Sequence, residues 1–121
     1  MEQNKPQEAA EQRLSFSGMP RYTEAVTSHG DNSVNIRYIF AGDVQGVGFR
    51  ATIRHLASGL PVRGWVRNER DGSVTLEAEA PPNHLDQLLT AIRAAFGANI
   101  SAISQSQPRP VQGLSGFEIR R

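Results

Sequence analysis

The chain has 121 residues, which suits one domain with some additional length, and its net charge of +1 lacks the basic excess typical of nucleic-acid-binding proteins. Hydrophobic residues make up 38% of the sequence, and no run approaches the roughly 20 apolar residues of a membrane span. The absence of cysteine excludes disulfides, a thiolate nucleophile and cysteine-based metal sites. These features fit a cytoplasmic protein without a membrane or nucleic-acid partner.

Residues 1–33 differ in composition from the remainder of the chain. They are rich in Glu, Gln, Ser, Pro and Gly, and their few apolar residues follow no period. Such a segment cannot bury enough apolar surface to offset the entropy lost on ordering, so we expect a disordered N-terminal tail. It also lacks the basic and apolar regions of a secretory signal. The ordered domain is expected to span residues 34–121.

The ordered part begins with an alternating segment and a helical one. Residues 34–41 alternate apolar and polar side chains, which predicts a strand. A glycine-rich loop follows. Apolar residues then recur at helical spacing, and we expect Gly59 and Pro61 to end that helix. The residues of this helical stripe are Phe49, Ile53, Leu56, Ala57 and Leu60.

A predicted hairpin comes next. GWVRN, from Gly64, and SVTLEAEA, residues 73–80, are strand-like, and the Asp71-Gly72 pair between them is typical of a hairpin turn. Alternation places Glu77 and Glu79 on the polar face of the second strand, so we expect solvated charges rather than a catalytic pair.

A second helix and two short strands complete the pattern. Asn83 is expected to cap the helix, with Asp86 in its first turn and Gly97 at its end. Segments 100–104 and 117–120 are predicted strands. The order strand, helix, strand, strand, helix, strand predicts an α/β (α+β) ferredoxin-like βαββαβ sandwich. We expect an antiparallel sheet of four to five strands with two helices on one face.

The stretch GDVQGVGFR, residues 42–50, concentrates three glycines and an arginine between the first strand and the first helix. Gly46 and Gly48 would let backbone N–H groups converge on an anion, and the following helix would add the positive end of its dipole. Arg50 would hold two phosphate oxygens at once. A purely structural turn uses the same residues, and spacing alone does not separate the two interpretations. The loop lacks the GK[ST] of a nucleotide P-loop, and Val44 stands where a cysteine-based phosphatase loop needs its cysteine.

VQGVGFR, with GWVRN and DGSV downstream, resembles the acylphosphatases, in residue type and in spacing. The similarity extends from about Val34 to Arg121. It implies a small stand-alone ferredoxin-like enzyme that hydrolyses acyl phosphates to a carboxylate and inorganic phosphate. It also implies direct attack of water on a small-molecule substrate by a monomer, with no metal, no cofactor and no covalent intermediate.

The same resemblance implies the site residues. The arginine that binds the phosphoryl group falls on Arg50, and the asparagine that positions the attacking water falls on Asn68. The cradle, which acts mainly through backbone N–H groups, falls on Gln45, Gly46, Val47, Gly48, Phe49 and Arg50.

Three residues depart from the family pattern. Pro61 and Ala80 replace glycines at turns and leave the chemistry untouched. Asp43 occupies a position that is often arginine or histidine, so its carboxylate would weaken phosphate affinity if it faced the site.

An acyl phosphate demands little catalytic machinery. Its leaving group is a carboxylate with a pKa near 4 to 5, which departs unprotonated at neutral pH and needs no general acid. Catalysis of phosphoryl transfer is mostly positioning and charge stabilisation. Arg50 and backbone N–H groups would supply the charge, and the amide oxygen of Asn68 would accept a hydrogen bond from water. No side chain is an evident base, and the substrate phosphate is expected to take the proton.

Two further functions stay open: a non-catalytic module that binds phosphate or acyl phosphate, and an RNA-binding ferredoxin-like sheet. The second is disfavoured because Arg67 stands where such a strand has an aromatic residue, and Trp65 is expected to pack in the protein. The three histidines match no metal-ligand spacing, and none is expected to bind a metal.

Overall fold

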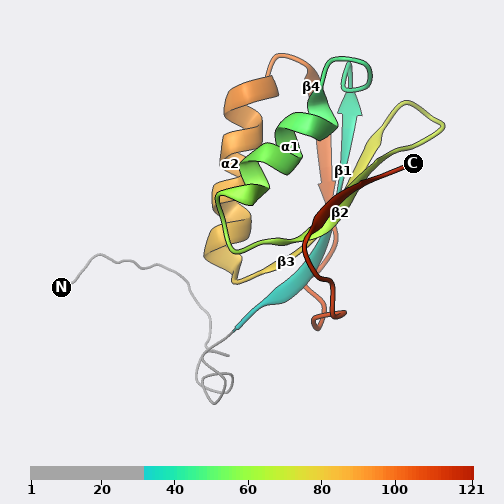
Figure 1. The fold of residues 1–121 in the computed structure, drawn as a ribbon. Coiled ribbons are helices and arrows are strands. Elements are labelled where there is room, and N and C mark those ends of the chain that lie inside the picture. Colours follow the sequence, from blue (N-terminus) through green and yellow to red (C-terminus); the bar gives the residue numbers. More distant parts are fainter. Residues whose placement is uncertain (1–31) are drawn as a thin grey trace. The chain divides into compact units, whose positions relative to one another are not determined.

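A computed structural model describes residues 32–121. The expectation of a disordered tail concerns residues 1–33 and falls almost wholly outside this range. Seven elements follow one another in the described part of the chain (Figure 1). They are β1 (Val34–Gly42), α1 (Phe49–Ser58), β2 (Arg63–Asn68), β3 (Val74–Ala80), α2 (Pro82–Phe96), β4 (Ile100–Gln105) and β5 (Phe117–Arg120). None of the helices in residues 32–121 has the length and apolar character needed to cross a membrane.

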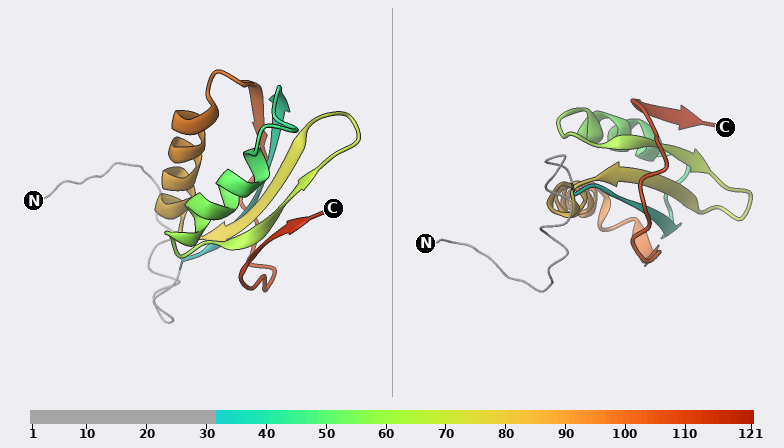
Figure 2. Two further views of the ribbon diagram at one scale, coloured as in Figure 1. Left: turned by 45° about the horizontal axis from the view of Figure 1, so that its top comes forward. Right: turned by 90° about the horizontal axis from the view of Figure 1, so that it is seen from below.

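The strands form one sheet in the order β4-β1-β3-β2-β5, with both helices on one face (Figures 1 and 2). The first four strands pair antiparallel in this order, which confirms the ferredoxin-like fold. The fifth strand pairs parallel with β2. The sheet is therefore mixed rather than antiparallel throughout, because a long connection returns β5 to the edge beside β2.

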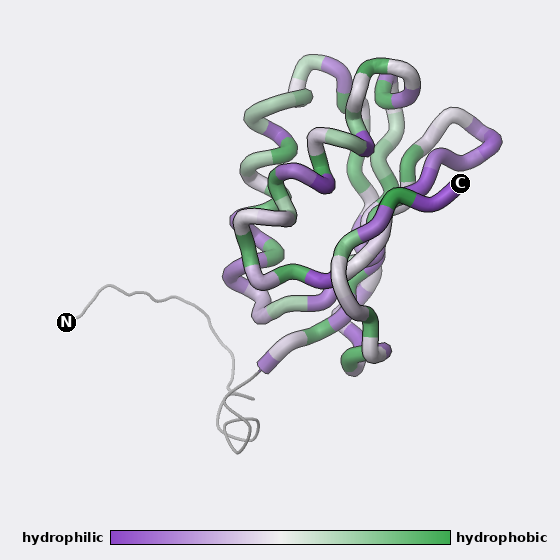
Figure 3. Tube along the Cα trace, viewed as in Figure 1, coloured by the Kyte–Doolittle hydropathy of each residue, from purple (hydrophilic) through white to green (hydrophobic). Residues whose placement is uncertain are grey.

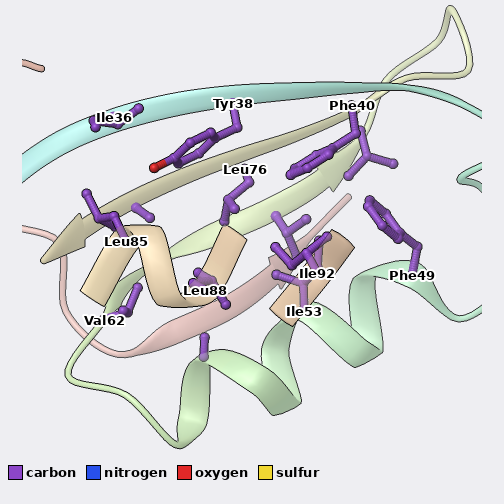
Figure 4. Close-up of a cluster of buried hydrophobic side chains, with 14 of the residues drawn as sticks. Ile36, Tyr38, Phe40, Phe49, Ile53, Val62, Leu76, Leu85, Leu88 and Ile92 are labelled. Atoms are coloured by element: carbon purple, nitrogen blue, oxygen red, sulfur yellow. The ribbon is translucent and has the colours of Figure 1, made fainter. Parts of the chain in front are cut away.

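The core lies between the sheet and the two helices (Figure 4). Alternation along the strands sends one set of side chains toward the helices, and the hydropathy of the trace alternates accordingly (Figure 3). Complete burial of such side chains stabilises the fold by about 1.5–3 kcal/mol each. The core side chains include Ile36, Tyr38, Phe40, Val66, Val74 and Leu76 from the sheet and Ile53, Leu85, Leu88 and Ile92 from the helices.

Three aromatic rings fix the start of α1 against the sheet and against α2. The Phe49 ring lies edge-on to Phe40, with centroids 5.2 Å apart, and edge-on to Phe96 at 5.1 Å. Edge-to-face pairs of this kind contribute roughly 0.5–1.5 kcal/mol beyond burial. Because Phe49 is the first residue of α1, this packing holds the glycine-rich loop before it at a defined place.

The start of α2 differs from the expectation. Pro81 is the N-cap, the helix begins at Pro82, and no acidic residue lies in its first turn. Asn83 is therefore inside the helix and does not cap it, and Asp86 lies beyond the first turn. The fixed φ of proline and its missing N–H suit the first helical position, so Pro82 begins the helix before Asn83 can cap it.

The glutamates of β3 also differ from the expectation, because both are buried. Glu77 is 6% exposed and Glu79 is fully buried. Asn35 Nδ2 donates to both carboxylates, at 3.0 and 2.9 Å, and the Arg37 guanidinium donates to Glu77 at 2.7 Å. Burial alone would raise the pKa of Glu77, but these hydrogen bonds outweigh it, and its pKa lies below the ordinary value.

The connection from β4 to β5, residues 106–116, explains this burial because it crosses the face of the sheet opposite the helices. Its backbone N–H groups at Gln112 and Leu114 donate to the Glu79 carboxylate. Burial acts to raise the pKa of Glu79, but hydrogen bonds from Asn35 and from these N–H groups, together with the charge of Arg63, hold it below the ordinary value. The buried carboxylate thus fastens the connection to the sheet.

Candidate active site

Three strands terminate at the same end of the sheet. Phe40, near the end of β1, and Asn68, the last residue of β2, both pair with Val74 at the start of β3. Because β5 runs parallel to β2 and pairs Arg120 with Arg67, it ends there too. The glycine-rich loop, the β2–β3 hairpin and the C-terminal strand therefore meet at one end of the domain (Figure 1).

The loop has the backbone conformation that its glycines allow. Gly46 and Gly48 have φ of 77° and 79°, which side chains rarely tolerate. Gly48 is the N-cap of α1 and supplies no side-chain cap, and the first turn contains no acidic residue. The first helical hydrogen bond joins the Thr52 N–H to the Gly48 carbonyl at 3.0 Å. The N–H groups at Phe49, Arg50 and Ala51 precede it, which leaves them available to an anion.

A pocket of about 160 Å³ lies at this helix start. Its wall combines residues of the loop, of α1, of β2 and of β5. The lining residues are Val44, Gly46, Gly48, Phe49, Arg50, Ala51, Asn68 and Ile119. Arg50 and Asn68 are the polar side chains of this lining, so the two residues expected to act on the substrate are brought together from different elements.

The Arg50 guanidinium is tethered at the pocket. Its Nη1 donates to the backbone carbonyl of Arg120 in β5, at 3.4 Å. The side chain is partly buried, and the long bond leaves most of its five N–H donors unused. A cation held in this way can form a two-pronged contact with an oxyanion in the pocket.

Asn68 has an unsatisfied acceptor. Its Oδ1 is buried and has no hydrogen-bond partner, the only such side-chain atom among residues 32–121. Buried polar atoms without partners are uncommon and costly, and they often mark the place of a water or a ligand. The free oxygen of Asn68 therefore suits a bound water that donates a hydrogen bond.

Other residues of the expected cradle have different surroundings. Gln45 Nε2 donates to the carbonyls of Glu69 and Ser73, at 2.8 and 2.9 Å, so this side chain fastens the loop to the hairpin. Val47 is 40% exposed, and the side chain of neither residue lines the pocket. Phe49 contributes its ring to the core. Any contact of these residues with a phosphate would therefore come from their backbone N–H groups.

Asp43 does not line the pocket. Its N–H donates to the Asn99 carbonyl at 2.8 Å, and Asn99 Nδ2 donates back to its carbonyl at 3.1 Å. The lining therefore combines N–H donors, one guanidinium and no carboxylate, a set that attracts anions. Within the described residues, no three His, Asp or Glu side chains form a group suited to a metal ion.

Sequence reasoning missed several contributors to the site. Val44, Ala51 and Ile119 form apolar wall, and the Arg120 carbonyl holds Arg50. Alternation in the closing GFEIRR segment places Ile119 on the helix side, which is a usable signal. The backbone tether from Arg120 has none, because it depends on β5 lying parallel to β2.

The comparisons with known proteins agree with this arrangement. Residues 36–119 match the family model described as Acylphosphatase. The chain is 42% identical over 85 residues to an acylphosphatase of Synechococcus sp. (strain CC9902), covering 69% of this chain and 72% of that protein. It is 43% identical over 81 residues to an acylphosphatase of Salinibacter ruber, covering 66% and 85%. Its fold is similar to the crystal structure of acylphosphatase from Bacillus subtilis, with a TM-score of 0.66, 32% identity, and coverage of 73% and 99%.

Proposed function

Because this chain belongs to the acylphosphatase family, we propose that it hydrolyses acyl phosphates in the pocket at the start of α1, by direct attack of water. Acylphosphatase activity splits the carboxyl–phosphate bond into a carboxylate and inorganic phosphate. The observation that carries the assignment is the buried, unpartnered Oδ1 of Asn68, which shares one pocket with the Arg50 guanidinium.

The phosphoryl group binds at the helix start. Backbone N–H groups of residues 45–50 and the helix dipole hold its oxygens, and Arg50 contacts two of them with its planar fork. These donors are in place before the substrate arrives, because aromatic packing fixes Phe49 and the Arg120 carbonyl holds Arg50. Pre-positioned donors stabilise developing charge without further rearrangement.

The attacking water binds at Asn68. Oδ1 accepts one hydrogen bond from this water and thereby directs an oxygen lone pair toward phosphorus. The water then forms a bond to phosphorus as the bond to the carboxylate oxygen breaks, with the two oxygens roughly in line. The carboxylate leaves with the electron pair and needs no proton at neutral pH. The proton of the water passes to the phosphate oxygens of the substrate.

We propose that this reaction uses neither a metal nor another cofactor. The polar side chains of the pocket are a guanidinium and an amide, and the remaining hydrogen-bonding groups there are backbone groups. Arg50 supplies the positive charge that a metal ion would otherwise supply at the phosphoryl oxygens. Its charge would also repel a metal ion bound beside it.

The RNA-binding alternative is weakened by the face of the sheet opposite the helices. Trp65 lies on this face but is only 4% exposed, which confirms that it packs in the protein. Three guanidinium groups cover its ring at 4.7–5.6 Å from the centroid, those of Arg37, Arg67 and Arg120. A stacking platform for bases needs exposed rings, whereas this ring is buried and covered by arginine side chains.

We propose that the acylphosphatase domain spans residues 34–121. We further propose that the protein acts in the cytoplasm, as a monomer, on a small-molecule substrate and without nucleic acid. Sedimentation at several protein concentrations tests the monomer, because self-association would shift the sedimentation coefficient upward with concentration.

Hydrolysis of benzoyl phosphate tests the function and separates it from a binding module. We expect turnover that survives dialysis against EDTA, and no stimulation by added Mg²⁺ or Zn²⁺. Binding of phosphate without turnover would support the non-catalytic module. Activity lost to EDTA and restored by a metal would overturn the water-only mechanism.

Arg50→Lys should hydrolyse benzoyl phosphate poorly, because a point charge cannot reproduce the two-pronged contact.

A further inference from the structure

A second hollow adjoins the pocket along the exposed side of α1. Its volume is about 300 Å³, and its lining consists of Ala51, Arg54, His55, Ser58 and Ile119. Ala51 and Ile119 also line the first pocket, so the two spaces are neighbours that share these two side chains. Asn68 lines the first pocket but not the second hollow. The second hollow therefore lies beside the wall of Ala51 and Ile119, of which Asn68 is not a part.

The helix brings the polar groups of this hollow onto one stripe. Ala51, Arg54, His55 and Ser58 follow the spacing of neighbours on one helical face. Four residues of α-helix rise by about 6 Å, so Arg54 and His55 lie about one turn beyond Ala51. A ligand bound at the helix start can therefore contact Arg54 and His55 through a substituent about one helical turn long.

The charge of this stripe is positive. The ten residues of α1 include two arginines and one histidine, and no carboxylate. Within residues 32–121, Arg54 takes part in none of the ion pairs, whereas Arg67 and Arg120 each hold a glutamate at 3.0 Å. The Ser58 hydroxyl donates to the His55 carbonyl at 2.6 Å and is already engaged. Arg54 is thus a cation without an ion-pair partner among residues 32–121, and it lines a hollow next to the pocket at the start of α1.

We propose that this second hollow binds the acyl part of the substrate and favours acyl phosphates that carry a second carboxylate, with Arg54 as the specificity-determining residue. The inference rests on the proposed function, which puts the phosphoryl group in the first pocket. In-line displacement requires the leaving carboxylate to lie opposite the attacking water, away from Asn68. The acyl group then passes Ala51 and Ile119 and places a distal carboxylate at the Arg54 fork, with a ring N–H of His55 as a further donor.

A pair of substrates with equal shape tests the assignment. Both 4-carboxybenzoyl phosphate and 4-carbamoylbenzoyl phosphate carry a distal group across the ring, charged in the first and neutral in the second. The two differ in intrinsic reactivity, so the informative quantity is the ratio of their kcat/KM values compared between protein variants. We expect Arg54→Gln to lower this ratio about two- to fivefold, the effect of losing one solvent-accessible ion pair. The change should lie mainly in the KM of the carboxylate compound.

Arg93→Gln is the matched control, because Arg93 is an exposed arginine of α2 that lines neither hollow. It should leave the ratio unchanged. An unaltered ratio in Arg54→Gln, or an equal fall in Arg93→Gln, overturns the subsite while the activity stands. Absence of hydrolysis of benzoyl phosphate and of both derivatives overturns the proposed function and the subsite together.

Discussion

The two polar side chains of the pocket have different proposed tasks, so their removal should produce different kinetic defects. In the proposed mechanism Asn68 contacts only the water, and its contribution is realised in the transition state. We expect Asn68→Ala to lower kcat about 100-fold, the scale of a lost positioning or charge-stabilising contact, while inhibition by inorganic phosphate stays within about twofold. Arg50→Ala should weaken phosphate inhibition as well, because Arg50 contacts the phosphoryl oxygens in the bound state.

Circular dichroism must show that both variants are folded, since a collapsed domain would imitate either defect. If Asn68→Ala lost phosphate affinity as severely as Arg50→Ala, the asparagine would belong to the cradle, and the water would need another partner.

Gln45 gives a second prediction for a single side chain. Its amide joins the loop to two hairpin carbonyls, and we expect Gln45→Ala to lower the free energy of unfolding in urea by about 2 kcal/mol, one for each hydrogen bond. Phosphate affinity should fall severalfold, because the loop is no longer fastened beside Asn68. Gln45→Glu should behave at least as badly, since a carboxylate would face two carbonyls. Full stability combined with lost affinity would mean that this side chain binds the substrate itself.

At the residue scale, sequence motifs could predict which polar side chains line the pocket but not the hydrogen bonds that each side chain makes. Arg50 and Asn68 follow from VQGVGFR and GWVRN, and the structure brings both to one pocket. The partners of Gln45 lie 24 and 28 residues further along the chain, and its orientation depends on where the hairpin folds back. No local pattern contains that information.

Among the elements, the connection of residues 106–116 makes the clearest prediction for pH. The pKa of Glu79 is lowered in the folded protein, below the ordinary value of about 4.3. Its ionised form therefore contributes stability that is complete above about pH 4.3 and is lost as the pH falls through the lower folded pKa. We expect Glu79→Gln to be less stable than the parent chain by about 1–2 kcal/mol at pH 7, with the difference shrinking as the pH falls below about 4.3.

Urea unfolding followed across this pH range measures the effect. Glu118→Gln is the control, because Glu118 is exposed and its one ion pair within residues 32–121 is with Arg120, so its replacement should have little effect. A stability difference for Glu79→Gln that does not change with pH would show that the carboxylate charge does not hold the connection.

At the element scale, periodic segments were predictable and their surroundings were not. Alternation and helical spacing indicate all seven elements and the β2–β3 hairpin at Asp71-Gly72. The burial of Glu77 and Glu79 escaped prediction because the segment that covers them has no period, and alternation alone describes an open face. The start of α2 was misplaced because two competing signals, Pro82 and Asn83, stand side by side, and proline prevailed.

At the scale of the whole molecule, the domain is expected to keep its hydrolytic activity when the residues before Asp31 are removed. The family match begins at residue 36 and the ordered elements begin at Val34. We expect a chain that starts at Asp31 to keep its specific activity toward benzoyl phosphate. A loss of tenfold or more, with unchanged circular dichroism, would show that the missing residues contribute to the site.

The uncapped start of α1 has a consequence for the thermodynamics of folding. Without a ligand, the native state contains N–H donors at Phe49, Arg50 and Ala51 that no side chain satisfies, and an anion bound there acts as the missing cap. Because the unfolded chain has no such site, occupancy shifts the unfolding equilibrium. Inorganic phosphate at a hundred times its dissociation constant should raise the unfolding free energy by about 2.7 kcal/mol. The melting temperature should then rise by roughly 4–8 °C per kcal/mol, so calorimetry with phosphate would measure affinity at this helix without any turnover.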